Sequence, residues 1–223
     1  MTVPISIIIP TLNEEKMLGK TLARLQQRKD CEIIVVDGGS NDATLVIARE
    51  ARCKVLSCDK GRARQMNFGA AKATGKVFLF LHGDTLLPDD FPNPILEALR
   101  QPDVAAGAFS LAIEGSSKSL ATMAFLANLR SRFLHLPYGD QALFTRRNMF
   151  YALGGFPEIE IMEDFVFVRK MKKKGKIIIL PECATTSARR WHNMGIVRTT
   201  MINQLMVGGY YLGIPPAILV RWY

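Results

Sequence analysis

The feature that most constrains the fold is a short apolar run that ends abruptly in polar residues. Residues 77–81 are too few for a helix and too continuous for a strand with one exposed face. Such a run is typical of a strand buried on both faces in a parallel sheet. His82, Gly83 and Asp84 follow it directly, and open α/β sheets bind ligands at the carboxyl ends of their strands. We therefore expect Asp84 to lie at a ligand site.

Strands and helices alternate before this run, which predicts an α/β fold with a mostly parallel central sheet flanked by helices. The expected strands are residues 5–9, 32–37 and 54–57, and the expected helices begin near residues 18, 43 and 62. Neither GxGxxG nor GxxxxGK[ST] occurs. A Rossmann dehydrogenase and a P-loop NTPase therefore lack their main signature.

Polar residues follow the first two strands. Asn13 is placed to cap the next helix, and Glu14 suits its first turn, because acids favour helix N-termini. The alternative is that both residues contact a base or ribose above the strand. Asp37 ends the second strand before Gly38, where an acid often takes a hydrogen bond from a base or ribose.

Two arginines begin the third helix, although cations near a helix N-terminus oppose the macrodipole. We interpret Arg62 and Arg64 as candidates for binding an anion. Solvated surface arginines are the alternative.

The second half is less regular. Expected helices cover residues 88–100, 117–134, about 163–174 and 195–211, and expected strands cover 105–113, 142–145, 176–180 and 184–191. For the apolar helix at 117–134 the sequence favours core packing over membrane contact.

Glu163 and Asp164 form an acid pair at the expected start of a helix. The simpler interpretation is structural, since acids are stabilised at helix N-termini. The functional interpretation makes one of them a general base. Neighbouring carboxylates tend to separate into one with a raised pKa and one that stays ionised, as proton abstraction requires.

Composition limits the partners and the compartment. The net charge of +9 suits an anionic partner: a phosphorylated substrate, a membrane surface or nucleic acid. The four cysteines form no CxxC pair, and the N-terminus has no leader pattern. We expect a cytoplasmic protein, either free or at the inner face of the membrane. The apolar C-terminus, which includes Trp222 and Tyr223, predicts core packing, a homo-oligomer interface or peripheral membrane contact.

Taken together, these segments resemble the family-2 glycosyltransferases, which have the GT-A (nucleotide-diphospho-sugar transferase) fold and invert the anomeric centre. The similarity lies in residues 7–14, 34–42, 67–84 and 154–156 and in the pair Glu163-Asp164. Residues 137–141 and 185–191 are similar to a compact bacterial subgroup described as radical-SAM or selenodomain associated.

The resemblance implies a set of site residues. On the nucleotide-sugar side these are Pro10, Thr11, Asn13, Glu14, Asp37, Gly38, Arg62, Arg64 and Asp84. Asp164 falls on the catalytic base, with Glu163 beside it. Gly155, Arg190 and Trp191 would shape the acceptor or diphosphate side. The implied cofactor is Mn²⁺ or Mg²⁺ held by Asp84.

The sequence departs from the family pattern at two places. His82 replaces the first acid of the DxD metal motif. It is an alternative metal ligand through its neutral imidazole, although Mg²⁺ and Mn²⁺ prefer oxygen donors. Ser187 replaces the glutamine of QxxRW, which argues against a processive polymer synthase. His192 is interpreted as a structural or surface residue, with metal ligation as the alternative.

The expected organisation is a glycosyltransferase domain at 1–192 and a helical C-terminal extension at 193–223. Residues 1–103 would bind the nucleotide sugar, and 104–192 would form the acceptor side. The expected partners are a nucleotide-sugar donor and a hydroxyl acceptor, free or lipid-linked, without nucleic acid. The alternatives are a sugar-phosphate nucleotidylyltransferase and a non-catalytic basic protein that binds membrane surfaces or nucleic acid.

Overall fold

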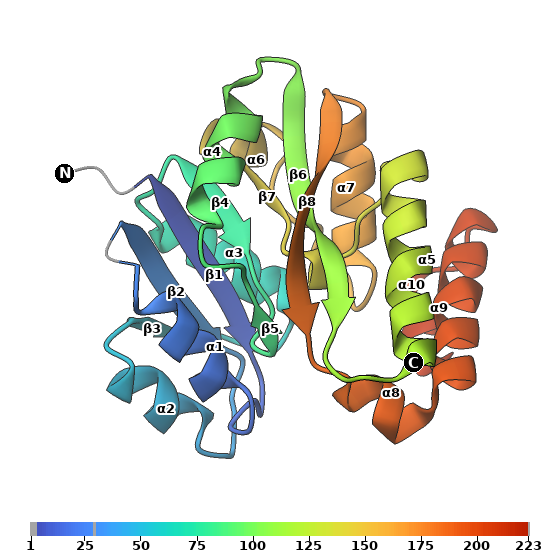
Figure 1. Cartoon of the computed structure of the whole chain (residues 1–223), viewed down its shortest axis with the longest axis horizontal. Helices are drawn as coiled ribbons and strands as arrows, with labels where there is room; N and C mark the ends of the chain where they lie inside the picture. The colour runs from blue at the N-terminus through green and yellow to red at the C-terminus, as the bar shows by residue number, and fades with distance from the viewer. Residues whose placement is uncertain (1–3, 29, 223) are drawn as a thin grey trace.

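A mixed sheet with helices on both faces forms the centre of the molecule (Figure 1). The computed structural model describes residues 4–28 and 30–222, so the expectations that involve residues 1–3 and Tyr223 lie outside it. Within that part of the chain the sheet has eight strands in the order β3-β2-β1-β4-β7-β6-β8-β5. The first half contains β1 (Ile5–Thr11), α1 (Leu18–Leu25), β2 (Cys31–Asp37), α2 (Thr44–Glu50), β3 (Lys54–Ser57), α3 (Arg62–Lys72) and β4 (Val77–Phe80).

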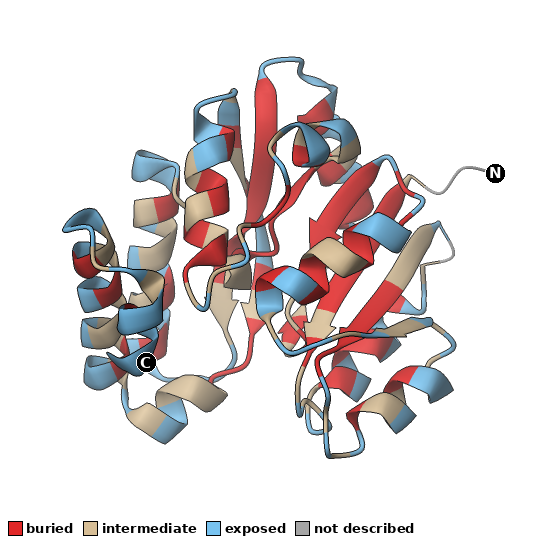
Figure 2. Cartoon of the chain, turned by 180° about the vertical axis from the view of Figure 1, so that it is seen from behind, coloured by how far each residue is buried: buried red, intermediate tan, exposed pale blue. Residues whose placement is uncertain are grey.

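The first half confirms the expected alternation of strands and helices. β3, β2, β1 and β4 pair in parallel, so their carboxyl ends meet at one edge of the sheet. β4 is buried on both faces, as its apolar run predicts. Phe78 and Phe80 belong to the core on one face, and Val77 and Leu79 to the core on the other. Figure 2 shows β1 and β4 buried between helices whose outer faces are exposed.

The second half adds antiparallel pairing to the sheet. It contains β5 (Thr85–Leu86), α4 (Pro92–Arg100), β6 (Val104–Ile113), α5 (Lys118–Leu134), a 3₁₀ turn at Gly139–Gln141, β7 (Phe144–Arg146), α6 (Arg147–Ala152), α7 (Glu163–Lys172) and β8 (Lys176–Thr186). β7 runs antiparallel to β4 and β6, whereas β6 and β8 are parallel. The short β5 was not expected from the sequence; it pairs with the end of β8.

The strand predicted for residues 184–191 is wrong in its second part. β8 runs without a break from Lys176 to Thr186, and an irregularity in its pairing with β6 absorbs the extra residues between Leu180 and Cys183. The chain then turns into α8 (Arg189–Met194). The Ser187 hydroxyl accepts a hydrogen bond from the Arg189 backbone N–H at 3.2 Å, which stabilises the turn. Arg190, Trp191 and His192 therefore lie on a helix.

Two further expectations need correction. Asn13 does not cap α1, which begins at Leu18; its side-chain oxygen instead accepts a hydrogen bond from the Asn41 N–H at 2.9 Å. α5 is not mainly core, because within it only Leu120, Ala124 and Ser131 are buried. Its large apolar side chains Phe125 and Phe133 are 63% and 74% exposed.

Three helical segments follow α8, and the first two reach the core beside α7. They are α9 (Ile196–Tyr211), α10 (Pro216–Leu219) and a 3₁₀ turn at Val220–Trp222. Met206 and Leu219 join Met162 and Phe165 in a small separate core. Among the described residues, no helix combines the length and apolar character that a bilayer crossing needs.

Gly69 tests the close packing of α3 on the sheet. A methyl group there would lie 2.6 Å from Ile8 Cγ2 and 2.9 Å from Val36 Cγ2, both in the core. We expect Gly69→Ala to lower the free energy of unfolding by about 1–3 kcal/mol through overpacking, measured by urea denaturation. Gly208→Ala in α9 is the matched control, because nothing lies within 4 Å of the added methyl. It should leave stability unchanged or raise it by about 0.5–1 kcal/mol. Equal effects of the two substitutions would contradict the packing.

Candidate active site

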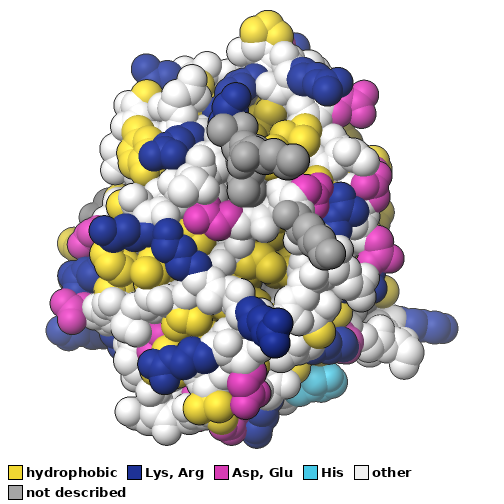
Figure 3. All heavy atoms as spheres, turned by 90° about the vertical axis from the view of Figure 1, so that its left-hand side faces the viewer, with side chains coloured by type: hydrophobic (Ala, Val, Ile, Leu, Met, Phe, Trp, Pro, Cys, Tyr) yellow, Lys and Arg dark blue, Asp and Glu magenta, His cyan; other side chains and the backbone are white. Residues whose placement is uncertain are grey.

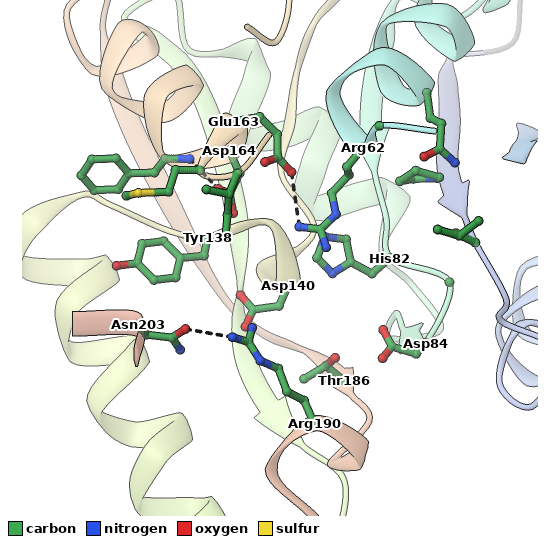
Figure 4. A pocket seen from close by; sticks show the side chains of 18 of the residues that line it. Arg62, His82, Asp84, Tyr138, Asp140, Glu163, Asp164, Thr186, Arg190 and Asn203 are labelled. Atoms are coloured by element: carbon green, nitrogen blue, oxygen red, sulfur yellow. Dashed lines mark hydrogen bonds and ion pairs between the residues drawn. The ribbon is translucent and has the colours of Figure 1, made fainter. Parts of the chain in front are cut away.

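A pocket of about 550 Å³ lies where the parallel strands end, between α3, α7, α8 and α9. Of the predicted site residues, Pro10, Thr11, Glu14, Arg62, His82, Asp84, Glu163, Asp164, Arg190 and Trp191 line it. Figure 4 shows Asp84 and Asp164 entering this pocket from different elements, with Arg62 and Arg190 near them. Tertiary folding thus brings together residues that are far apart along the chain.

Arg189 brings together two acids from different loops, Glu14 and Asp84. Its guanidinium donates to both carboxylate oxygens of Glu14, at 2.8 and 2.9 Å, and lies 3.8 Å from Asp84 Oδ2. Burial raises the pKa of Glu14 and that of Asp84, and Arg189 partly offsets both shifts. One cation therefore stabilises two partly buried carboxylates from different loops.

Glu163 and Asp164 differ sharply in their surroundings, although they are adjacent. Glu163 is only 2% exposed and forms an ion pair with Arg62 at 3.3 Å. Burial and the neighbouring Asp164 charge raise the pKa of Glu163. Asp164 is partly exposed; it accepts hydrogen bonds from the Gly139 N–H at 2.6 Å and the Phe165 N–H at 2.7 Å. Asp164 is thus oriented by backbone donors and accessible from the pocket.

His82 packs against the turn that holds Asp164. Burial, and then the nearby Arg62 charge, lower the pKa of His82 to about 3, so its imidazole is neutral at pH 7. A methyl group on Gly139 would lie 2.9 Å from His82 Nε2 and 3.2 Å from Asp164 Oδ2. Glycine at 139 therefore allows the imidazole and the carboxylate to approach the same backbone.

Asp140 is a site residue that the sequence reasoning missed. It lies beside Arg190 in the pocket lining (Figure 4). Its Oδ1 is buried and has no hydrogen-bond partner among the described residues. Burial raises the pKa of Asp140 to about 6; Arg130 lowers it and Asp164 raises it further. The pocket therefore contains a carboxyl group whose raised pKa lies close to neutral pH.

Six predicted residues do not line the pocket. They are Asn13, Asp37, Gly38, Arg64, Gly155 and His192. The buried Asp37 carboxylate accepts hydrogen bonds from the N–H groups of Gly39 and Ser40, each at 2.9 Å, so it holds its own turn. Arg64 pairs with Asp59 and Glu158 on the surface, and His192 is exposed. Gly155, at φ 71°, lies against the Asn67 side chain.

The sequence does not identify several residues of the pocket, for reasons that the structure makes clear. Arg189 lies at the end of a segment that the sequence predicts as a strand, whereas in the structure it begins a helix. Asp140 lies in a segment that was recognised only as a family signature. Met206, Val207 and Val220 form an apolar part of the pocket lining. Their sequence context does not distinguish them from ordinary core residues.

Side chains of the pocket alone do not complete a site for a divalent cation, so substrate phosphates would have to supply further ligands. Among residues 4–28 and 30–222 no group of three His, Cys, Asp or Glu side chains is arranged to hold a metal ion. Mg²⁺ is often bound by one or two carboxylates together with substrate phosphates. Asp84 suits this arrangement as a single protein ligand. His192 does not, because it lies outside the pocket lining.

Comparison with known proteins extends the geometric result. Residues 6–156 match the sequence profile described as glycosyl transferase family 2. The chain is 28% identical over 213 residues to the O-antigen chain rhamnosyltransferase RfbN of Salmonella typhimurium, covering 85% of this chain and 67% of the relative. It is 31% identical over 114 residues to dolichol-phosphate mannosyltransferase of Pyrococcus furiosus, covering 47% of this chain and 32% of the relative.

A third relative, 4,4'-diaponeurosporenoate glycosyltransferase of Staphylococcus haemolyticus, is 37% identical over 109 residues. The match covers 45% of this chain and 28% of that protein. The chain thus spans less than a third of the length of two of these three relatives and about two thirds of the other.

Solved structures show that the fold is GT-A-like. A crystal structure of S. aureus TarS has a TM-score of 0.67 and 20% identity, covering 90% of this chain and 66% of TarS. The mannosyltransferase PcManGT from Pyrobaculum calidifontis, solved with GDP-Man and Mn²⁺, has a TM-score of 0.69 and 19% identity, covering 91% and 61%. The predicted α/β fold class is confirmed by both structures.

Asp140 generates a prediction about pH. Since its folded-state pKa of about 6 exceeds the ordinary aspartate pKa of 3.8, the wild-type protein loses stability as pH rises between these values. Asp140→Asn should therefore raise the free energy of unfolding at pH 7.5 by about 1–3 kcal/mol, and the gain should vanish near pH 4. Urea denaturation at both pH values measures it.

The matched control is Asp103→Asn, since a hydrogen bond from Lys176 lowers the pKa of Asp103. That substitution should reduce stability at pH 7.5 and have less effect at low pH. An Asp140→Asn variant that is less stable than wild type at both pH values would contradict the environment described here.

Proposed function

Because the chain belongs to glycosyl transferase family 2, we propose that it transfers one sugar from a nucleotide diphosphate sugar to an acceptor hydroxyl, with inversion at the anomeric carbon. The observation that carries the proposal is that Asp84 and Asp164, which lie on separate elements, line one pocket. Arg189 lies beside Asp84, and Arg62 pairs with Glu163, the chain neighbour of Asp164. The arrangement suits an anionic leaving group at one end and a proton acceptor at the other.

The donor would occupy the end of the pocket near β1 and α3. Pro10, Thr11 and Glu14 line that end, and Asn13, Asp37 and Gly38 support it from the adjoining turns. Arg62 and Arg189 are placed to attract the diphosphate. A Mn²⁺ or Mg²⁺ ion held by Asp84 would supply further charge neutralisation for the leaving diphosphate.

The acceptor would enter from the side of α7 and α9. Asp164 would take the proton of the acceptor hydroxyl while the hydroxyl oxygen attacks the anomeric carbon. The bond between that carbon and the diphosphate oxygen would break, and its electron pair would leave with the diphosphate. The Gly139 and Phe165 N–H groups hold the carboxylate in place. Glu163 would fix Arg62, while Arg190 and Trp191 would shape the acceptor side and Gly155 would support it from an adjoining turn.

Family membership favours this function over the two alternatives considered from the sequence, nucleotidyl transfer and non-catalytic binding. Within the family, the segments 137–141 and 185–191 support placement in the compact radical-SAM or selenodomain-associated subgroup. The names of RfbN and of the mannosyltransferase structure support a sugar-transferring activity but leave the donor and the acceptor of this protein open.

Asp164→Asn tests the general base. It removes the proton acceptor but keeps the shape of the side chain, so we expect transfer to fall by about 10²–10⁴-fold. Nucleotide diphosphate release in the presence of acceptor measures transfer, and calorimetry measures donor binding, which should persist. Asp103→Asn, on a surface ion pair, is the control and should retain full activity. Normal turnover by Asp164→Asn would remove Asp164 from this role.

A thermal-shift panel tests the donor and the metal together. We expect one of the UDP-, GDP- or dTDP-sugars to raise the melting temperature, and Mn²⁺ to increase that shift, because ligands that bind the folded state stabilise it. In Asp84→Asn the Mn²⁺-dependent part of the shift should disappear. If Mn²⁺ enlarges the shift equally in the wild type and in Asp84→Asn, Asp84 is not the metal ligand.

A further inference from the structure

α5 carries a continuous apolar stripe on its outer face. Phe125, Leu126, Leu129 and Phe133 are separated by one, three and four positions, which places them on one side of a helix. They are between 42% and 74% exposed, while the buried residues of α5 lie on the opposite side. Exposed apolar patches of this kind mark interaction surfaces.

α9 carries a second stripe of the same kind. Val197, Met201 and Leu205 recur every four residues and are 72%, 58% and 54% exposed, and Leu212 follows at 83%. α5 and α9 lie side by side at one end of the molecule (Figure 1), where the Thr200 hydroxyl is 3.3 Å from Met123 Sδ. We call the two stripes together the α5–α9 surface.

The segments that form this surface contain no acidic residue. Residues 115–139 and 183–222 have no Asp or Glu, but they include the exposed cations Lys118, Arg198 and Arg221. Lys172 adds a cation at the end of α5, where it donates a hydrogen bond to the Leu134 carbonyl at 2.7 Å. By contrast, Figure 3 shows acidic and basic side chains interspersed on the opposite end of the molecule.

We propose that the α5–α9 surface docks on an anionic phospholipid bilayer, with the two helices lying in the plane of the interface. Apolar side chains would enter the boundary between headgroups and acyl chains, and the flanking lysines and arginines would contact lipid phosphates. Helices that combine an exposed apolar stripe with exposed cations and no acidic side chain suit such a surface.

Charge favours a bilayer over a second copy of the chain. A two-fold symmetric interface places the same patch on both partners. Two α5–α9 surfaces would therefore bring Lys118, Arg198 and Arg221 of each copy together, with no acidic residue in either segment to pair with them. Like charges in a desolvated interface are unfavourable.

Docking would also place the acceptor side of the pocket near the bilayer. α9 exposes Leu205 on its outer face, while the adjacent Met206 and Val207 line the pocket. A lipid-linked acceptor fits this arrangement; that consequence rests on the proposed function, whereas the docking itself does not.

Vesicle flotation of the full chain tests the proposal. We expect binding to mixed phosphatidylcholine–phosphatidylglycerol vesicles, weaker binding to phosphatidylcholine alone, and release by salt. Phe125→Gln with Phe133→Gln should lower partitioning about tenfold or more, and Leu205→Gln should lower it further. Val46→Gln is the matched control, since Val46 is 53% exposed on α2, and it should bind like wild type.

Circular dichroism and donor-induced thermal shifts keep the test independent of folding and of catalysis. Both should be unchanged in the α5 and α9 variants, whose substituted residues do not line the pocket. Absence of binding to anionic vesicles, or binding that survives these substitutions, would overturn the proposal. A dimer in light scattering that the substitutions dissociate would assign the surface to a second copy. In each of these cases the proposed sugar transfer could still hold.

Discussion

The pocket depends on the pairing of buried carboxylates with arginines. Desolvation raises the pKa values of Glu14, Asp84 and Glu163, and each has a guanidinium partner that opposes the shift. Arg189 serves two of these acids and Arg62 the third. Without these partners, ionised groups at the end of the sheet would carry an uncompensated desolvation cost.

The sheet determines where these pairs can form. β4 is buried on both faces, and the segment that follows it carries Asp84 into the pocket. The antiparallel β7 beside it follows directly on the turn at Gly139–Gln141. That turn supplies the N–H that holds Asp164 and places Asp140 in the pocket. The change from parallel to antiparallel pairing is therefore what brings the two halves of the site together.

The C-terminal helices link the pocket to the outer surface. α9 lines the pocket with Met206 and Val207 and exposes Leu205 on its other side; Leu212, directly after α9, is also exposed. Arg169 lies over the rings of Phe165, Tyr210 and Tyr211, which ties α7 to the end of α9. α7 begins with Glu163 and Asp164, so α9 packs on the helix that carries the acid pair.

The sequence by itself determined the local elements of the first half, because a short apolar run, a turn and a periodic helix are properties of neighbouring residues. It also placed Asp84 after a buried strand and Asp164 in the first turn of a helix, and both residues line the pocket. Tertiary structure alone decided which charges meet. Arg189 contacts Glu14 across 175 positions of the chain, and Asn13 joins a neighbouring loop instead of capping α1. It also decided that α5 faces outward, since helical periodicity identifies an apolar stripe but not what covers it.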